Sequence, residues 1–281
     1  MKKISARKKP TVPLLKWSGW TERGNRANNE DSFLGLQFDA REVFRLGKYG
    51  EASTETTDFT FAVCDGMGGA QAGEFASNIA VEKITTLLPR AFQHAAGGLQ
   101  PGFADVLEEL FTQIHKALVF LGESYEECAG MQTTLSLGWF TPGWMYFGHI
   151  GDSRIYHLPK RKKEVRLLTQ DDTHVGWLVR NGQLNEYEAR NHPRRNVLQK
   201  ALGGGNQFVD PQIGAVECER GDIFLFCTDG LTEGIFNGQL AELLRATATA
   251  DANISPARHL VDVAVKNYGR DNTTALAVEV V

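Results

Sequence analysis

Hydrophobic residues along the chain follow two patterns, which predict strands, then helices, then strands again. The short apolar runs at residues 59–64 and 223–227, each followed by turn-forming residues, are typical of buried strands. Over residues 71–88, and again after the Gly97-Gly98 break, apolar residues recur at spacings of three and four, which predicts two long amphipathic helices. We expect Pro89 to end the first helix, because proline lacks a backbone N–H.

The second half of the chain is predicted to return to strands. Residues 133–140, 144–150 and 154–158 are rich in aromatic and branched residues and are separated by turn residues, so we expect an antiparallel meander. We expect the remaining elements to be an irregular insert at about 171–202, helices at about 239–248 and 255–267, and a last strand at 274–280. This order predicts an α+β fold. Residues 39–58 are polar and Gly-rich and are expected to form an exposed loop.

Composition supports one folded domain with a basic tail. The chain has 281 residues, of which 42% are hydrophobic and 23% charged, which is ordinary for a globular protein. A net charge of −4 argues against nucleic acid as the main partner, since that partner needs a broad basic face. Residues 1–15 contain Lys2, Lys3, Arg7, Lys8 and Lys9 and are predicted to be a basic tail before a single domain at 16–281. The tail is either solvated or makes an electrostatic contact with a partner.

Nothing in the sequence predicts secretion or membrane insertion. The basic start is followed only by a short apolar stretch, and no run approaches the roughly 18 apolar residues of a membrane helix. The four cysteines have no C-x-x-C spacing: Cys64, Cys128, Cys218 and Cys227. We therefore expect a cytoplasmic, monomeric protein with no disulfides, no zinc and no membrane span.

Acidic residues recur at the ends of apolar runs and in tight turns. They are Glu30-Asp31, Asp65 in Asp-Gly66, Asp152 in Gly-Asp-Ser-Arg, Asp229 in Asp-Gly, and Asp271 in Asp-Asn. A single Asp-Gly is a favoured turn dipeptide, but several such carboxylates can converge on one rim of a sheet. Packed together they would repel one another and raise each other's pKa unless a cation were bound. An all-oxygen set favours Mg²⁺ or Mn²⁺.

Two neighbours of these carboxylates have candidate roles. Gly66 lets the backbone approach closely enough for a carbonyl oxygen to serve as a ligand. Arg26 lies four residues before Glu30 and is either a bidentate clamp for phosphate or one half of a surface salt bridge.

In these segments the chain resembles the prokaryotic metal-dependent Ser/Thr protein phosphatases of type 2C, the PPM family. The resemblance covers about residues 16–281, and the insert at about 171–202 resembles the flap of the family, with matching residues between Gly182 and Gly203. The other matching segments, in family order, are R-A-N-N-E-D at 26–31, V-C-D-G-M-G-G at 63–69, Q-T-T at 132–134, G-D-S-R at 151–154, C-T-D-G-L-T at 227–232 and G-R-D-N-T-T at 269–274.

The resemblance implies a central antiparallel β-sandwich flanked by pairs of helices, with two Mn²⁺ or Mg²⁺ ions at one end. By position, Asp65 would bridge both ions, the Gly66 carbonyl would bind one, and Asp229 and Asp271 would complete the other. Glu30 and Asp31 would act through water molecules, and Asp152 with Asp229 would hold a third, weaker ion. Catalysis would rest on Arg26, which holds the phosphate, and on Asp65 and Asp229.

The function implied is hydrolysis of phosphoserine and phosphothreonine in proteins by direct attack of a metal-activated water. The expected partners are phosphorylated proteins, including a cognate bacterial Ser/Thr kinase and its targets. Two departures stand out: Met67 replaces a histidine of eukaryotic relatives, and Asp171-Asp172 precedes Thr173 where relatives often have Asp-His.

Two other interpretations stay open at the level of sequence. An aspartyl-phosphate phosphatase would use Asp65 or Asp229 as nucleophile, but neither is followed by the second aspartate of a D-x-D motif. A catalytically inactive phosphopeptide-binding module would have lost a metal carboxylate, and none is lost.

Overall fold

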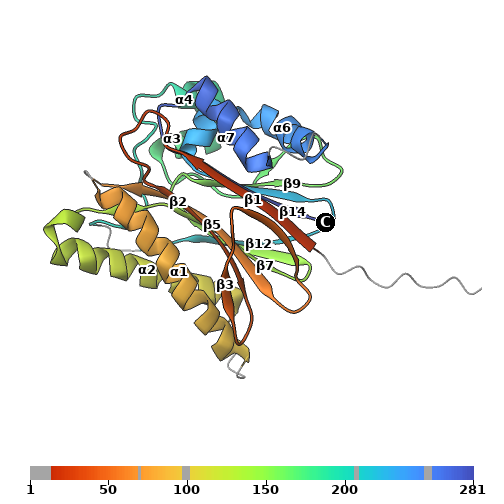
Figure 1. Ribbon diagram of the computed structural model, residues 1–281. Coiled ribbons are helices and arrows are strands. Elements are labelled where there is room, and N and C mark those ends of the chain that lie inside the picture. Colours follow the sequence, from red (N-terminus) through yellow and green to blue (C-terminus); the bar gives the residue numbers. More distant parts are fainter. Residues whose placement is uncertain (1–13, 69–70, 97–101, 206–208, 250–254) are drawn as a thin grey trace, which may run out of the picture.

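Two antiparallel sheets packed face to face form the centre of the molecule (Figure 1). The computed structural model describes residues 14–68, 71–96, 102–205, 209–249 and 255–281. The basic residues predicted in the tail lie outside the described residues, and the first strand begins at Leu14.

The first sheet has the strand order β10-β9-β13-β14-β1-β4. Its strands are β1 (Leu14–Glu22), β4 (Tyr49–Ser53), β9 (Arg154–Leu158), β10 (Arg166–Leu167), β13 (Ile223–Cys227) and β14 (Thr273–Val280).

The second sheet has the order β11-β6-β5-β7-β8-β12, with β2 paired to β5 and β3 paired to β2. Its strands are β2 (Asp31–Phe38), β3 (Val43–Arg45), β5 (Asp58–Met67), β6 (Gln132–Thr133), β7 (Leu135–Thr141), β8 (Trp144–Ile150), β11 (Leu202–Gly203) and β12 (Gln212–Glu217).

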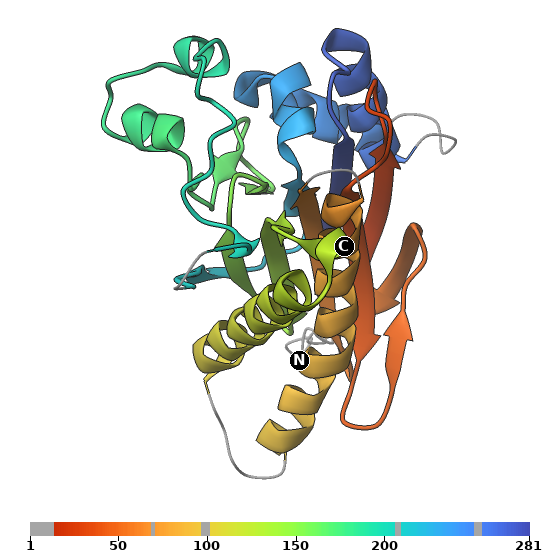
Figure 2. The same ribbon diagram turned by 90° about the vertical axis from the view of Figure 1, so that its left-hand side faces the viewer.

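Helices cover the outer face of each sheet (Figures 1 and 2). The pair α1 (Ala72–Ala96) and α2 (Phe103–Ser124), followed by a short 3-10 turn (Glu126–Cys128), packs on the second sheet. The helices α5 (Asp229–Gly234), α6 (Asn237–Thr249) and α7 (Pro256–Asn267) pack on the first sheet. The flap carries two short helices, α3 (His174–Arg180) and α4 (Glu186–Arg190), beside one end of the sandwich.

The continuous apolar runs of the sequence are strands buried on both faces. In β13, Phe224 and Phe226 point into the core between the sheets, whereas Leu225 and Cys227 pack against the helices outside. In β5, Phe61 and its inward-facing neighbours alternate in the same way with residues under α1 and α2. A helix-covered sandwich therefore explains why these strands lack the polar alternation of an exposed sheet. The α+β sandwich with flanking helix pairs is confirmed.

The first long helix does not end at Pro89, contrary to the sequence prediction, but continues to Ala96. Proline removes one helical hydrogen bond and costs about 3 kcal/mol in a helix interior. Ile84 and Leu88, just before it, are fully buried against the second sheet. This packing holds the preceding turns in place, so the helix tolerates the proline.

Two further expectations were wrong. Residues 154–158 do not continue the meander of β7 and β8, because β9 pairs with β13 and β10 in the other sheet. The chain crosses between the sheets at Gly151, which has a φ of 108°. Residues 39–58 are not simply a loop, since β3 and β4 lie there as exposed outer strands, which explains their polar sequence.

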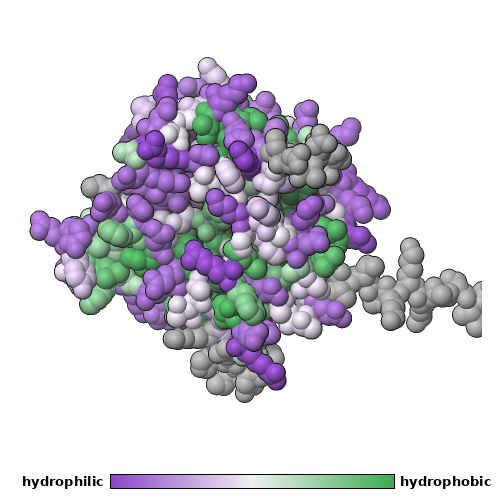
Figure 3. Space-filling model, viewed as in Figure 1, coloured by the Kyte–Doolittle hydropathy of each residue, from purple (hydrophilic) through white to green (hydrophobic). Residues whose placement is uncertain are grey.

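The surface is mixed in character, as the composition predicts. On the face shown in Figure 3, hydrophilic side chains interrupt the hydrophobic ones. No helix among the described residues is both long and apolar enough to cross a membrane. The thiols of Cys64, Cys128, Cys218 and Cys227 are free.

The buried carboxyl group of Asp58 should make the stability of the protein depend on pH. Burial raises the pKa of its carboxyl to about 6, although Trp139 Nε1 donates a hydrogen bond to Oδ2 at 2.8 Å. Because this pKa lies above its unfolded value, Asp58 contributes stability that is present below about pH 4 and lost as the pH rises through 6. Asp58→Asn keeps an acceptor for Trp139 and cannot ionise. We expect the variant to gain about 1–3 kcal/mol relative to wild type between about pH 4 and 7.

The measurement is urea unfolding at a series of pH values in metal-free buffer, where all other titrating groups are common to both proteins. A stability difference that does not change with pH would contradict the prediction.

Candidate metal centre

The inward-facing rows of the sandwich end in polar residues at one end of the molecule. Along β5 the row Phe59, Phe61, Val63 continues to Asp65, and Asp31 of β2 lies opposite Asp65 in the strand register. Side chains alternate with a period of two along a strand, so both carboxylates project between the sheets. Asp65 is thus a strand residue and not the start of a turn.

The first sheet supplies hydroxyl groups to the same place. Thr274 of β14 and Thr228, which follows β13, donate hydrogen bonds to Asp31 Oδ2 at 2.6 and 2.8 Å. These bonds tie the two sheets together across the open end. Asp31 Oδ1 is buried and accepts no hydrogen bond from any residue that the structure describes.

Asp229 begins α5 directly after Thr228 and has a similar unused atom. Its Oδ1 is buried without a hydrogen-bond partner among the described residues. A Cβ at Gly230 would overlap the backbone of Asn272, so glycine is required for this close approach. Buried polar atoms are nearly always paired, so the free oxygens of Asp31 and Asp229 suit a ligand.

The backbone around Gly66 is packed equally closely. Its N–H donates to the Glu30 carbonyl at 3.1 Å, and a Cβ at this position would overlap the Gly73 carbonyl of α1. A Cβ at Gly73 would in turn lie 2.8 Å from the carboxyl carbon of Glu30. The two glycines therefore let β5, α1 and the Glu30 segment meet.

Asn272 fixes the loop that carries Arg26. Its side-chain amide donates to the carbonyls of Arg23 and Asn28, each at 2.9 Å, and its Oδ1 accepts from Glu30 N at 2.8 Å. Arg26 Nη2 forms an ion pair with Asp271 Oδ2 at 2.6 Å, and the arginine side chain is 53% exposed. This hydrogen bond raises the pKa of the guanidinium. An exposed pair contributes only about 0–1 kcal/mol, so Arg26 can exchange partners.

Asp152 occupies a turn that is held from several sides. Asp172 N donates to the Gly151 carbonyl at 2.7 Å, and Asp172 Oδ2 accepts from Gly151 N at 3.0 Å. Arg154 donates to both oxygens of Asp171, at 2.9 and 2.6 Å. The unusual Asp171-Asp172 pair thus clamps the turn, and Asp152 itself forms no ion pair with the described residues.

His149 supports the same turn from the core. It is fully buried, with Nδ1 2.8 Å from Ser136 Oγ and Nε2 3.1 Å from the Gly151 carbonyl. Burial lowers the pKa of this imidazole to about 4. A neutral ring with both nitrogens engaged is a structural group, not a proton donor to substrate.

The carboxylates resist ionisation together. Burial raises the pKa of Asp31 and of Asp152 to about 7. Burial, followed by the charges of Asp31 and Asp229, raises the pKa of Asp65, and burial with the charge of Asp152 raises that of Asp229. A bound divalent cation would favour the ionised forms of all four.

These residues fit a divalent metal ion because their donor atoms are oxygens and because one oxygen each of Asp31 and Asp229 has no hydrogen-bond partner among the described residues. Within the described ranges no three acidic, imidazole or thiol groups are already placed to hold a metal ion. Asp271 is engaged by Arg26, and Asp31 by the two threonines. The structure brings Asp31 and Asp65 together in register and connects Asp271 to Arg26 and, through Asn272, to Glu30.

Comparison with known proteins decides the family. The family model described as protein phosphatase 2C matches residues 49–262. The chain belongs to the protein phosphatase 2C family. The expected family is confirmed.

Named relatives support this family assignment. The chain is 31% identical over 273 residues to the serine/threonine protein phosphatase PstP of Mycobacterium tuberculosis, covering 95% of this chain but 45% of that protein. It therefore spans less than half the length of that relative. It is 33% identical over 220 residues to the serine/threonine phosphatase stp of Listeria monocytogenes, covering 77% of this chain and 82% of the relative.

Solved structures show the same fold. The S. agalactiae serine/threonine phosphatase matches with a TM-score of 0.77 and 28% identity, covering 95% of this chain and all 100% of that one. The catalytic domain of PstP in complex with two manganese ions matches with a TM-score of 0.73 and 28% identity, covering 96% and 100% of the respective chains.

Sequence reasoning assigned no role to several residues that build the site. Hydrogen bonds that hold the acidic segments in place come from Thr228, Thr274 and Asn272. Gly73 leaves room for the carboxyl group of Glu30. Thr228 and Thr274 did carry a signal, since each is a polar residue at one end of a largely apolar strand, where a buried hydroxyl group needs a hydrogen-bond partner. Their shared partner, Asp31, is distant in the sequence and left no local signal.

Gly66→Ala should weaken metal binding. The added Cβ must displace the backbone of Gly73 and Glu30. We expect Mn²⁺ affinity to fall about 10- to 100-fold, the range seen when groups that support metal ligands are changed. Isothermal titration calorimetry measures this, with circular dichroism to show that the variant is folded.

Gly238→Ala in α6 is the matched control, because a Cβ there meets no atom within 4 Å. Unchanged Mn²⁺ affinity in folded Gly66→Ala would refute the assignment of Gly66 to the metal centre.

Proposed function

We propose that the chain hydrolyses phosphoserine and phosphothreonine in other proteins by direct attack of water at a centre of two Mn²⁺ or Mg²⁺ ions. The observation that carries the proposal is a set of buried carboxylates at the open end of the sandwich: Asp31 lies opposite Asp65 in the strand register, and the charge of Asp229 contributes to the raised pKa of Asp65, after burial. Two of these carboxylates keep a buried oxygen without a partner among the described residues. The names of the relatives support the substrate class.

The residues divide into ligands and supports. Asp65, the Gly66 carbonyl, Asp229 and Asp271 would hold the two ions, with Glu30 and Asp31 acting through water molecules. Asp152 with Asp229 would hold a third, weaker ion. When bound, the ions supply positive charge that lowers the pKa of water and offsets the charge of the phosphate.

Arg26 would bind the phosphate group. Its loop is fixed by Asn272, so only the side chain has to move from Asp271 to the phosphate oxygens. A guanidinium can hold two phosphate oxygens at once and thereby orient the ester bond. Neither Met67 nor buried His149 can protonate the departing serine or threonine oxygen, so water would supply that proton.

The alternatives have less support. An aspartyl-phosphate mechanism needs a carboxylate free to attack phosphorus, whereas Asp65 and Asp229 are crowded by other carboxylates that a cation must balance. A binding module without activity would not need a complete set of metal carboxylates.

We further propose a cognate Ser/Thr kinase and its targets as substrates, which a comparison of phosphoproteomes with and without the gene would test. The cytoplasmic location and monomeric state remain predictions.

The proposal is tested by removing the metal. Hydrolysis of a phosphoserine peptide should disappear with a chelator and return when Mn²⁺ or Mg²⁺ is added, because the ligand set is all oxygen. Full activity in metal-free buffer would exclude the proposed centre, and a trapped phosphoenzyme would favour the aspartyl-phosphate alternative.

Asp229→Asn and Arg26→Ala should have different kinetic effects. Asp229→Asn removes charge needed to hold the metal, and we expect kcat to fall at least about 100-fold, as with loss of one charge-stabilising group. Arg26→Ala removes a charged hydrogen bond worth about 1.5–3 kcal/mol, so we expect KM to rise by roughly 10- to 100-fold with a smaller change in kcat.

Steady-state kinetics on a phosphopeptide at saturating Mn²⁺ distinguish the two effects. Near-normal kcat in Asp229→Asn would show that this carboxylate does not serve the centre.

A further inference from the structure

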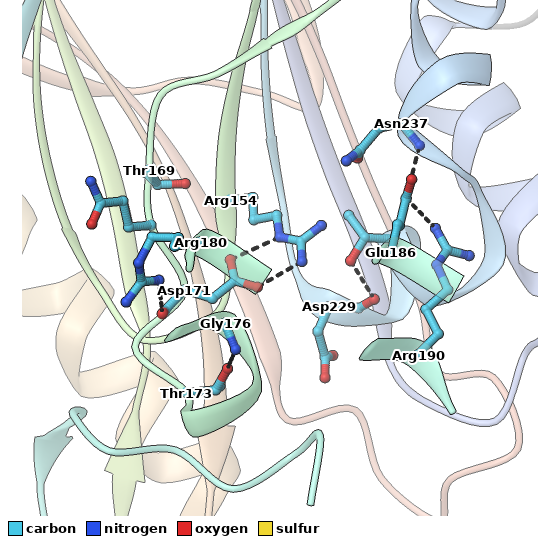
Figure 4. A network of polar contacts seen from close by, with 12 residues as sticks. Arg154, Thr169, Asp171, Thr173, Gly176, Arg180, Glu186, Arg190, Asp229 and Asn237 are labelled. Carbon is cyan, nitrogen blue, oxygen red and sulfur yellow. Dashed lines mark hydrogen bonds and ion pairs between the residues drawn. The ribbon is translucent and has the colours of Figure 1, made fainter. Parts of the chain in front are cut away.

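A cleft of about 260 Å³ leads from the metal centre to the flap. Asp152 and Asp229 line its inner end, α3 and α4 form part of its walls, and Thr232 and Glu233 of α5 lie on the core side. Figure 4 shows Asp229 between two groups of side chains, Asp171 with Arg180 on one side and Glu186 with Arg190 on the other. The cleft is therefore continuous with the proposed catalytic site.

The charges in the cleft walls nearly cancel. Three ion pairs line it: Arg154 with Asp171 at 2.6 Å, Arg190 with Glu186 at 3.1 Å, and Arg195 with Glu233 at 3.1 Å. These pairs are also anchored to the fold, since Arg154 Nη1 donates to Tyr156 Oη and Arg190 donates to the Ile235 carbonyl at 2.7 Å. Their charges are consequently unavailable to an incoming group.

Arg180 is different. It lines the cleft, its side chain is exposed, and its only hydrogen-bond partner among the described residues is the Asp171 carbonyl, to which Nη1 donates at 2.8 Å. It forms no ion pair within the described part of the chain. Asp172 attracts it electrostatically, but that carboxylate is held by Gly151 N and does not line the cleft. With Asp152 and Asp229 assigned to the metal, Arg180 leaves the cleft with one excess positive charge.

We propose that this cleft binds the residues beside the phosphorylated serine or threonine of the substrate, and that Arg180 selects an acidic side chain there. The inference rests on the proposed function, which places the phosphate at the metal centre that Asp229 helps to form. The cleft is smaller than the roughly 300 Å³ at which pockets for drug-sized ligands begin, so it suits one or two side chains of an extended peptide. Leu167, Val175 and Val179 provide apolar contacts for the stem of such a side chain.

The test compares phosphopeptides that differ only in charge beside the phosphoserine. Aspartate is placed at each neighbouring position in turn and compared with asparagine, which has nearly the same shape, and with lysine. At the position that reaches the cleft we expect kcat/KM to be about 3- to 10-fold higher for aspartate than for asparagine, the range for a partly exposed charged hydrogen bond. Because binding is affected, the difference should appear mainly in KM.

Variants of Arg180 assign the preference to this residue. Arg180→Gln should abolish the preference for aspartate, Arg180→Glu should reverse it towards lysine, and Arg180→Lys should retain part of it. Each value is divided by kcat/KM for an aryl phosphate on the same variant, which corrects for changes at the metal centre. Arg194→Gln is the matched control, because Arg194 is exposed on the same flap and does not line the cleft.

The possible failures are distinguishable. Equal kcat/KM for aspartate and asparagine peptides at every position, or a preference that survives Arg180→Gln, would overturn the role of the cleft. Absence of hydrolysis of every phosphopeptide in the presence of Mn²⁺ would instead refute the proposed function.

Discussion

The burial of several carboxylates at the open end of the sandwich, together with their mutual repulsion, is the constraint on which the site depends. The alternation that places Phe61 and Val63 in the core also places Asp65 between the sheets, and the strand register brings Asp31 opposite to it. The burial that stabilises the hydrophobic residues in these rows raises the pKa of the acidic ones. The same fold therefore creates both a stable core and a local need for positive charge, which a divalent ion would meet.

The polar groups around these carboxylates already form hydrogen bonds with one another. Only selected carboxylate oxygens are therefore available to a ligand. Thr228 and Thr274 occupy one oxygen of Asp31 and leave the other, while Asn272 uses its amide group to hold the Arg26 loop. Because these hydrogen bonds hold the carboxylates and the Arg26 loop in place, the ligands need to move only a short way when a cation binds. Preorganisation lowers the cost of reorganising the site during reaction, which is a main source of catalytic power in phosphate hydrolysis.

Much of the fold and of the acidic set could be predicted from the sequence, because apolar runs and Asp-Gly pairs leave local signals. The elements that were mispredicted depend on tertiary contacts. Pro89 is tolerated because Ile84 and Leu88 are packed, and β9 joins the other sheet because the chain crosses at Gly151. The pairing of Arg26 with Asp271, residues 245 positions apart, likewise has no local signal.

The metal centre and the flap are built on different physical principles, and this bears on how specificity can vary. In the candidate metal centre, strand register places Asp31 opposite Asp65, whereas Asp229 begins α5 and Asp271 lies just before β14. The helical part of the flap is attached through side chains: Tyr156 Oη donates to Asn237 at 2.7 Å, and Asn237 N donates to Glu186 of α4 at 3.2 Å. A polar attachment of this kind keeps the flap beside Asp229 while leaving the residues that face the cleft outside the core. On the proposed role of Arg180, substitutions there would change which peptides are accepted without altering the strands that carry Asp31 and Asp65.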